Sequence, residues 1–466
     1  MNSLLKRASL PDSFTCEKYR VFNLTENPFP STPFTSQGKS DKRYNGDIYE
    51  ETIRQKEYNQ IEQVFLKAPQ SDPNHFRIGY IEDTSYVGRG NGKSSFAINL
   101  LKKINNAYCS DITNEENKCF GLYITPEVSG RTRSFGNFID LIAYAIFESN
   151  IVEYSLASLR LSAIIELDLF HFEEDDLKDE VKVIDDMNNI EWFNKNKIYL
   201  GDIHSYLLKN NFFKAVNSEF PLQKITWSKF DKSNITIITK RELISYYKGI
   251  KKDNEKMQFI FDDLVQIFLA SGFNGAYLIV DDFERIPDFQ SDRQKRDFAM
   301  ELRTNFFDGS NANAQIGFFN LLLMLHAGVI RLVEKAWSDS GMEQRSPLTT
   351  INQELTHVIS FDKLSSNHAI LLVKKYLSEY RINPNDTLEP FTRDAIIRIG
   401  EVNDYNAAKI LKLSYLLIES AANESITEIN IDFVNKILQK EAAEVETTKT
   451  TIIDENSEDL LKKARR

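Results

Sequence analysis

The chain has 466 residues, of which 42% are hydrophobic and 27% are charged, and its formal net charge is -11. This length predicts two or three domains with a sizeable buried core, and the composition argues against disorder over most of the chain. The acidic balance excludes a surface that attracts nucleic acid as a whole, although a basic face confined to one region stays compatible with it.

Cysteine usage and hydropathy limit the class of protein further. Cys16, Cys109 and Cys119 show no paired spacing, so the sequence predicts neither a disulfide framework nor a zinc ribbon and favours a reducing compartment. The N-terminus lacks the long apolar core of a leader peptide, and the most apolar later stretch, 318–325, is too short to span a bilayer. We therefore expect a soluble, cytoplasmic protein without a membrane partner.

The first part of the chain predicts an arm followed by the beginning of an α/β core. Residues 1–70 carry many turn formers in an extended arm and then a helical pattern over about 48–66. Residues 71–151 predict a strand, either FRIGYI or the shorter SYV before Gly88, then a glycine loop and the helix SSFAINLLKKINN. A second strand, CFGLYIT, and the apolar helix FGNFIDLIAYAIFES follow.

The remaining chain predicts an insertion, the second half of the core and a helical end. Residues 152–253 include the acidic run FEEDDLKDEVKVIDD and separate the two halves of the core by more than a strand and a helix need, so we expect an inserted subdomain. Residues 254–360 predict a buried strand, YLIV, and another that ends near His326, where we expect the sheet to be complete. Residues 361–440 predict helices only, as in a small lid domain, and 441–466 a flexible tail.

The glycine loop GRGNGKSS has the chemistry of a phosphate-binding loop. Glycines let backbone N–H groups close around phosphate oxygens, where a Cβ atom would block the approach. Lys93 would place its ammonium on the β- and γ-phosphates of ATP, and the Ser94 hydroxyl would bind Mg²⁺. The first glycine comes one position later than in the usual G-x-x-x-x-G-K-[ST] spacing. We expect the whole loop to bind the nucleotide: Gly88, Arg89, Gly90, Asn91, Gly92, Lys93, Ser94 and Ser95.

An acidic strand end, YLIVDDFE, supplies the partner that such a loop requires. Asp281 follows four apolar residues, so a buried parallel strand would deliver it near the Mg²⁺, which it would bind through water. Asp282 is the candidate to orient or deprotonate the attacking water, and Glu284 is the alternative. Taken alone, the same residues also suit a loop that begins after a core strand.

Two further side chains are candidates for the catalytic site. His326 ends the next predicted strand and could contact the γ-phosphate or the attacking water, although a histidine in the core or a loop is an equal alternative. Arg345, in EQRSPL, is a candidate finger that a neighbouring subunit would supply, and a solvated loop arginine is the alternative.

Taken together, these motifs predict an α/β fold in which helices sandwich the parallel sheet of a P-loop NTPase, with an inserted subdomain and a C-terminal helical lid. The chain resembles an AAA+ ATPase of the broad group that includes the origin-recognition, ExeA-type secretion and transposition-regulator ATPases. The arm FNLTENPFPSTPF resembles the N-terminal segment of that group, and LEPFTRDAIIRIGEVNDYNAAKILKLSYLLIESA resembles its lid. The resemblance implies that a lid arginine reads the nucleotide, and here Ala408 takes its position and Lys409 is the substitute.

The resemblance implies ATP and Mg²⁺ as cofactors and ATP hydrolysis, at a fast or a slow rate, that drives or resets an assembly. The partners would be copies of this chain or other proteins, and DNA is a further candidate, because residues 224–256 interleave lysines and an arginine with aromatic side chains. The pair Asp281 and Asp282 is similar to that of the signalling P-loop ATPases, so a signalling or defence switch in which ATP binding is the main event is the alternative. A binding module with a degenerate site is a third.

Overall fold

The computed structural model describes residues 17–66, 77–83, 90–106, 118–127, 130–209, 238–326, 329–348, 357–440 and 443. The chain divides into two compact units. We call Met1–Gln55, Val87–Phe96 and Asp362–Arg466 the helical unit, and Lys56–Tyr86 with Ala97–Phe361 the sheet unit. Among the described residues, no helix has both the length and the apolar character that crossing a bilayer requires.

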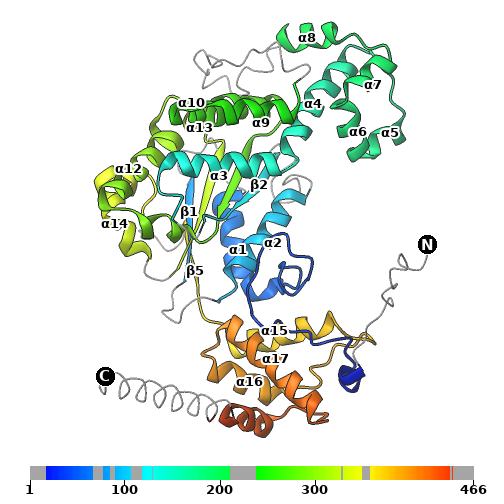
Figure 1. Cartoon of the computed structure of the whole chain (residues 1–466), viewed down its shortest axis with the longest axis vertical. Helices are drawn as coiled ribbons and strands as arrows, with labels where there is room; N and C mark the ends of the chain where they lie inside the picture. Colours follow the sequence, from blue (N-terminus) through cyan, green and yellow to red (C-terminus); the bar gives the residue numbers. More distant parts are fainter. Residues whose placement is uncertain are drawn as a thin grey trace, which may run out of the picture. The chain divides into compact units, whose positions relative to one another are not determined.

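A five-stranded, all-parallel sheet forms the centre of the sheet unit, with strand order β2-β3-β4-β1-β5 (Figure 1). Its strands are buried on both faces and therefore read as continuous apolar runs. The strands are β1 (Ile78–Asp83), β2 (Cys119–Ile124), β3 (Gly275–Val280), β4 (Phe319–Leu325) and β5 (Val358–Phe361). The predictions of the first four are confirmed, with FRIGYI as the source of β1.

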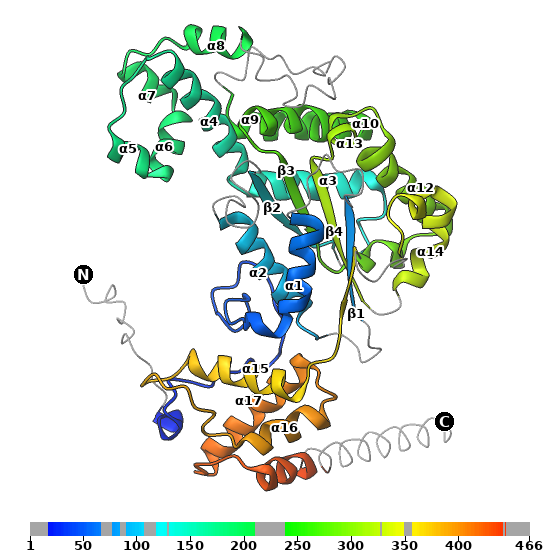
Figure 2. The ribbon, with the colours of Figure 1, turned by 180° about the vertical axis from the view of Figure 1, so that it is seen from behind.

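The strand order determines which helices cover each face. The chain crosses from β1 to the β2 edge and then returns through β3 and β4, so right-handed crossovers place the helix after β1 on one face and the later helices on the other. Figure 2 accordingly shows α1 (Gln55–Ile61) and α2 (Lys93–Asn105) in front of the sheet, whereas α3 (Phe135–Glu148) covers it in Figure 1.

Glycines on the α2 face let that layer approach closely. A Cβ atom at Gly79 would lie 1.8 Å from the ring of Phe65, and one at Gly121 would lie 2.9 Å from the Ile104 side chain. Any larger residue at these two strand positions would force the layers apart.

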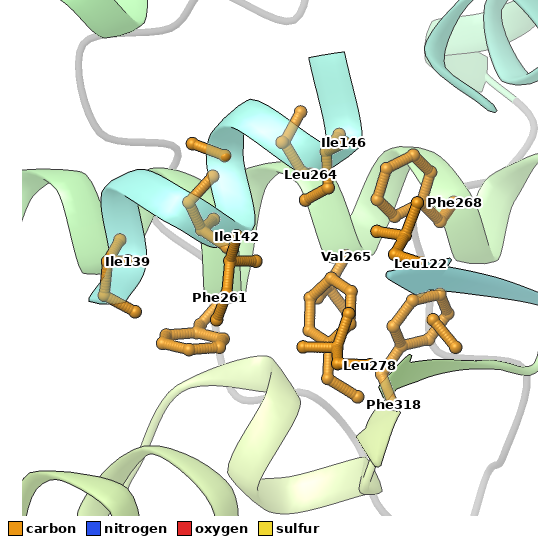
Figure 3. Packing of buried hydrophobic residues seen from close by; sticks show 14 of the residues in the cluster. Leu122, Ile139, Ile142, Ile146, Phe261, Leu264, Val265, Phe268, Leu278 and Phe318 are labelled. Atoms are coloured by element: carbon orange, nitrogen blue, oxygen red, sulfur yellow. The ribbon is translucent and has the colours of Figure 1, made fainter. Parts of the chain in front are cut away.

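The opposite face carries the main hydrophobic core. Figure 3 shows side chains of α3 and of the helical stretch that leads into β3, packed on Leu122, Leu278 and Phe318. That stretch runs through α10 (Asp253–Gln258), a π-helical turn at Phe259–Leu264 and α11 (Val265–Ala270). Its π turn is a feature that apolar spacing in the sequence does not indicate.

Helices fill the described part of the predicted insertion. They are α4 (Ile151–Glu166), α5 (Glu174–Lys178), α6 (Glu180–Met187), α7 (Ile190–Lys195), α8 (Leu200–Lys209) and α9 (Lys240–Gly249). The buried guanidinium of Arg160 joins them, donating to the carbonyl oxygens of Met187 (3.0 Å) and Ile238 (2.6 Å) and to Oδ1 of Asn188 (2.7 Å). Burial lowers the pKa of Arg160 to about 10.

The sheet extends further than we expected from the sequence. Helix α12 (Asp292–Arg303) precedes β4. We expected the sheet to be complete at His326, but α14 (Val329–Ser340) is followed by β5, which pairs with β1 at the sheet edge. The prediction was wrong because β5 has only four residues, VISF, and so gives a weak apolar signal.

The helical unit combines the N-terminal segment with the C-terminal helices α15 (Ser366–Ser378), α16 (Arg393–Val402), α17 (Ala407–Asn423) and a further helix over 431–440. Its described N-terminal residues pack as part of this core: Thr25 N donates to the Tyr380 carbonyl (2.9 Å), and Arg381 Nη1 donates to the Phe22 carbonyl (2.8 Å). The helices predicted for 361–440 are confirmed. Apart from Ala443, the predicted tail lies outside the described residues.

Candidate functional site

Polar side chains follow three neighbouring strands at one edge of the sheet. Asp83 ends β1, Asp281 follows β3, and His326 follows β4, which lies between those two strands. Because the strands are parallel, their carboxyl ends meet at the same edge, which is where open α/β sheets bind ligands. We call this the carboxylate edge and assign to it Asp83, Asp281, Asp282, Glu284 and His326.

Asp281 is buried and held by two hydrogen bonds. The Tyr123 hydroxyl, from β2, donates to Oδ2 of Asp281, and the Asp282 backbone N–H donates to Oδ1 (2.9 Å). Burial and the Asp281 charge both raise the pKa of Tyr123, which keeps the phenol neutral and able to donate.

Asp282 adopts a left-handed backbone conformation, with φ 51° and ψ 43°. Such a conformation is uncommon outside glycine but is one that aspartate tolerates. Its carboxylate forms an ion pair with Arg285, and Nη1 of Arg285 donates to the carbonyl oxygen of Pro126 (2.9 Å) just after β2. The side chain of Asp282 is therefore held by a cation that is itself anchored on β2.

His326 lies among three carboxylates. Its Nε2 is 2.9 Å from Oε1 of Glu284 and 3.2 Å from Oδ1 of Asp282, and its Nδ1 is 3.4 Å from Oδ2 of Asp83. Glu284 and Asp83 are buried. A protonated imidazole would donate from both nitrogens and would partly neutralise this group of negative charges.

The same residues offer ligand atoms for a cation. One atom each from Asp282, Glu284 and His326 lie within 4.8 Å of one another. Carboxylate oxygens suit Mg²⁺, whereas an imidazole nitrogen is more typical of transition metals. Asp281, which offers only oxygen atoms, is therefore a better Mg²⁺ ligand than the group of Asp282, Glu284 and His326, which includes a nitrogen.

The described part of the glycine loop lies in the helical unit. Gly90 (φ 116°) and Gly92 (φ 85°) both use conformations that favour glycine. The Gly90 carbonyl accepts from the Ala408 N–H at the start of α17 (3.0 Å), and a Cβ atom on Gly90 would lie only 2.7 Å from that of Ala408. The loop is thus packed closely against the first turn of α17.

Helix α2 begins at Lys93, directly after the loop, and Ser94 and Ser95 lie in its first turn. Lys93 is buried. The start of this 13-residue helix is the positive end of its dipole, which favours an anion. Gly88 and Arg89 lie outside the described residues.

Two N-terminal side chains hold the loop, and sequence reasoning missed both. Nη2 of buried Arg54 donates to the carbonyl oxygens of Asn91 (3.2 Å) and Asp362 (2.9 Å). The Thr35 hydroxyl is 2.8 Å from that of Ser95. No motif links Arg54 or Thr35 to the loop, and only the folded unit brings them together.

The remaining candidates have other surroundings. Lys409 is exposed, and its backbone N–H donates to Oδ1 of Asn406 (3.1 Å), which caps α17. Arg345 is half-exposed and forms an ion pair with Asp308 (2.6 Å). The charges of Arg345 and Asp308 both affect the pKa of Arg77, the residue directly before β1, so these side chains are neighbours. Arg345 therefore lies at the amino end of the strands, opposite the carboxylate edge. A finger acting on a neighbouring copy need not lie at its own carboxylate edge, so that role stays a prediction.

Comparisons with protein-family models, with curated proteins and with solved structures found no match. The α/β fold, with its five-stranded parallel sheet flanked by helices and its helical C-terminal region, is what the chain itself establishes.

Proposed function

We propose that the protein is a Mg²⁺-dependent ATPase of the AAA+ type, which uses ATP hydrolysis to drive or reset a protein or protein–DNA assembly. The observation that carries the proposal is the sequence of elements in the fold. A parallel strand precedes a loop with two glycines at positive φ and a lysine at a helix start, while another strand of the same sheet is followed directly by Asp281. Backbone N–H groups, an ammonium and a carboxylate are the groups that a metal–triphosphate requires.

Each residue has one role in this proposal. Gly90 and Gly92 give the phosphates access to backbone N–H groups, and Lys93 places its charge on the β- and γ-phosphates. Ser94 and Asp281 would hold Mg²⁺, which when bound supplies charge neutralisation to the phosphates. Both residues offer oxygen ligands only, as the ion prefers.

Two carboxylates compete for the role of orienting the attacking water. The Asp282 carboxylate is paired with the Arg285 guanidinium, and an adjacent cation makes a carboxylate a weaker base, whereas Oε1 of buried Glu284 lies 2.9 Å from Nε2 of His326. We therefore favour Glu284 for this role, with His326 as the group that holds its carboxylate. In this arrangement the proton from water passes to the carboxylate–imidazole pair.

The alternative is a switch in which ATP binding is the main event and turnover is slow. The ion pair between Asp282 and Arg285 favours it where Asp282, not Glu284, orients the water, because a carboxylate fixed by a cation is a weak base. The C-terminal helices also agree with the alternative. Ala408, at the position of the nucleotide-reading arginine, contacts the loop as a donor from its backbone N–H to the Gly90 carbonyl, and the side chain of Lys409 is exposed.

Nucleotide binding and hydrolysis by the purified protein would test the proposal. We expect Mg²⁺-dependent binding of ATP by the wild type and its loss in Lys93→Ala, since the loop then lacks its cation. Lys436→Ala is the matched control, because Lys436 is exposed and pairs with Glu424 at the surface of the helical unit. Binding without turnover, alone or with double-stranded DNA, would favour the switch, and absence of binding would contradict both.

Assembly and DNA contact need separate tests. If Arg345 acts in trans, mixing inactive Arg345→Ala and Glu284→Gln chains should restore part of the activity. For DNA, the described portion of residues 224–256 has lysines engaged by carboxylates, Lys240 with Glu153 and Lys256 with Asp140. A gel-shift titration at several salt concentrations would show whether any phosphate contact exists.

A further inference from the structure

The position of Tyr123 on β2 brings its ring to the carboxylate of the next strand. Tyr123 pairs with Ile279 in the parallel register of β2 and β3, and Asp281 lies two residues beyond Ile279. Side chains two apart along a strand direction share a face, so Asp281 lies diagonally across from Tyr123, a separation that a long side chain can span. Tyrosine is long enough to bring its hydroxyl to Oδ2 of Asp281, where it donates a hydrogen bond.

The two oxygens of Asp281 are each fixed by a different donor. Tyr123 engages Oδ2 and the Asp282 N–H engages Oδ1, so the plane of the carboxylate is set from both sides. Each ionised oxygen can accept a second hydrogen bond, which leaves both able to receive one from a metal-bound water. The phenol therefore orients the carboxylate without displacing a ligand.

We propose that Tyr123 is a positioning residue that sets the Mg²⁺ affinity of the site through Asp281. The inference rests on the proposed function, because it assigns Asp281 to Mg²⁺. A hydroxyl that only satisfied a buried carboxylate would contribute to folding, and its loss would leave the metal dependence unchanged. A positioning residue instead alters the Mg²⁺ requirement while nucleotide binding without Mg²⁺ is retained.

The test is Tyr123→Phe, which removes only the hydroxyl. We expect the Mg²⁺ concentration for half-maximal ATP turnover to rise by about tenfold or more, the loss that follows from one hydrogen bond to a charged group. Affinity for ATP in the presence of a chelator should stay within about twofold, which also shows that the glycine loop is folded.

Tyr247→Phe is the matched control. Tyr247 also donates to a carboxylate, Oδ1 of Asp140 at 2.7 Å, and its pKa is likewise raised by burial, but it joins α9 to α3 on the other face of the sheet. Thermal unfolding of both variants measures the structural cost of losing such a hydroxyl. We expect Tyr247→Phe to leave the Mg²⁺ requirement at the wild-type value.

Asp281→Asn completes the comparison. With a neutral amide in place of the carboxylate, adding Tyr123→Phe should not change the Mg²⁺ requirement further. Asp281→Asn and the double variant are the pair to compare if Tyr123→Phe alone does not fold. Equal Mg²⁺ requirements in Tyr123→Phe and Tyr247→Phe would overturn the inference and leave the proposed function intact. A wild type that binds ATP without any Mg²⁺ dependence would overturn both.

Discussion

Gly90→Ala tests whether the glycine loop is packed on α17 as the helical unit shows. The new Cβ atom would lie 2.7 Å from Cβ of Ala408 and 2.9 Å from Oδ1 of Asn406, whereas carbon atoms in contact are normally about 3.5–4.0 Å apart. Gly90 also has φ 116°, which alanine rarely adopts. The substitution therefore combines backbone strain with a steric overlap.

The two contributions can be separated in magnitude. A strained φ costs about 1–3 kcal/mol, and overpacking costs a further 1–3 kcal/mol or so. Gly92→Ala isolates the first, because Gly92 has φ 85° and a Cβ atom there would meet nothing within 4 Å. We expect Gly90→Ala to destabilise the helical unit by about 2 kcal/mol more than Gly92→Ala does.

Native-state hydrogen exchange of the α17 amides measures this effect in the correct unit. The three tryptophans of the chain, Trp192, Trp227 and Trp337, all belong to the sheet unit, so fluorescence monitors the control region instead. Ala408→Gly removes the nearest overlapping atom and should restore the overlap part of the loss when combined with Gly90→Ala. Equal effects of Gly90→Ala and Gly92→Ala, or no coupling between Gly90→Ala and Ala408→Gly, would refute the packing.

Three further predictions concern the sheet unit. Arg160→Met leaves three acceptors of the insertion without their donor and should lower the free energy of unfolding by about 3 kcal/mol, whereas exposed Arg293→Met should change it by less than about 0.5 kcal/mol in the same urea titration. Burial lowers the pKa of His357 in the folded protein below the ordinary value of 6.5. The contribution of the neutral imidazole to stability is therefore present above pH 6.5 and is lost as the pH falls below 6.5. His357→Gln should reduce the decline in the urea midpoint between about pH 7.5 and 5. An unchanged decline would contradict this. Glu284→Gln should lower turnover by about tenfold or more while ATP binding is retained, and by more than Asp282→Asn does; the reverse order would assign the water to Asp282.

The sequence predicted the elements whose signal is local. Long apolar runs such as YLIV and FNLLLML identified β3 and β4, and the spacing after the glycines identified α2. The strand order and the short edge strand β5 were not accessible, because they depend on pairing between segments far apart in the chain.

The candidate site was predicted in the same uneven way. Asp281, Asp282, Glu284 and His326 were found because each follows an apolar strand, and the structure brings them to one edge. The groups that orient them, such as the Tyr123 phenol and Arg285, carry no motif. A supporting side chain is recognisable only from the geometry that places it against its partner.

The helical unit is assembled from three separate stretches of chain, and this fixes an order of events during synthesis. The sheet unit ends at Phe361, so all residues of that unit leave the ribosome before the residues of α15 do. The N-terminal segment and the glycine loop must wait for α17, more than 300 residues after the loop, before their packing is complete. A nascent chain whose α17 has not yet emerged therefore has an unfinished loop. Synthesis through α17 becomes a condition for any function that the loop performs.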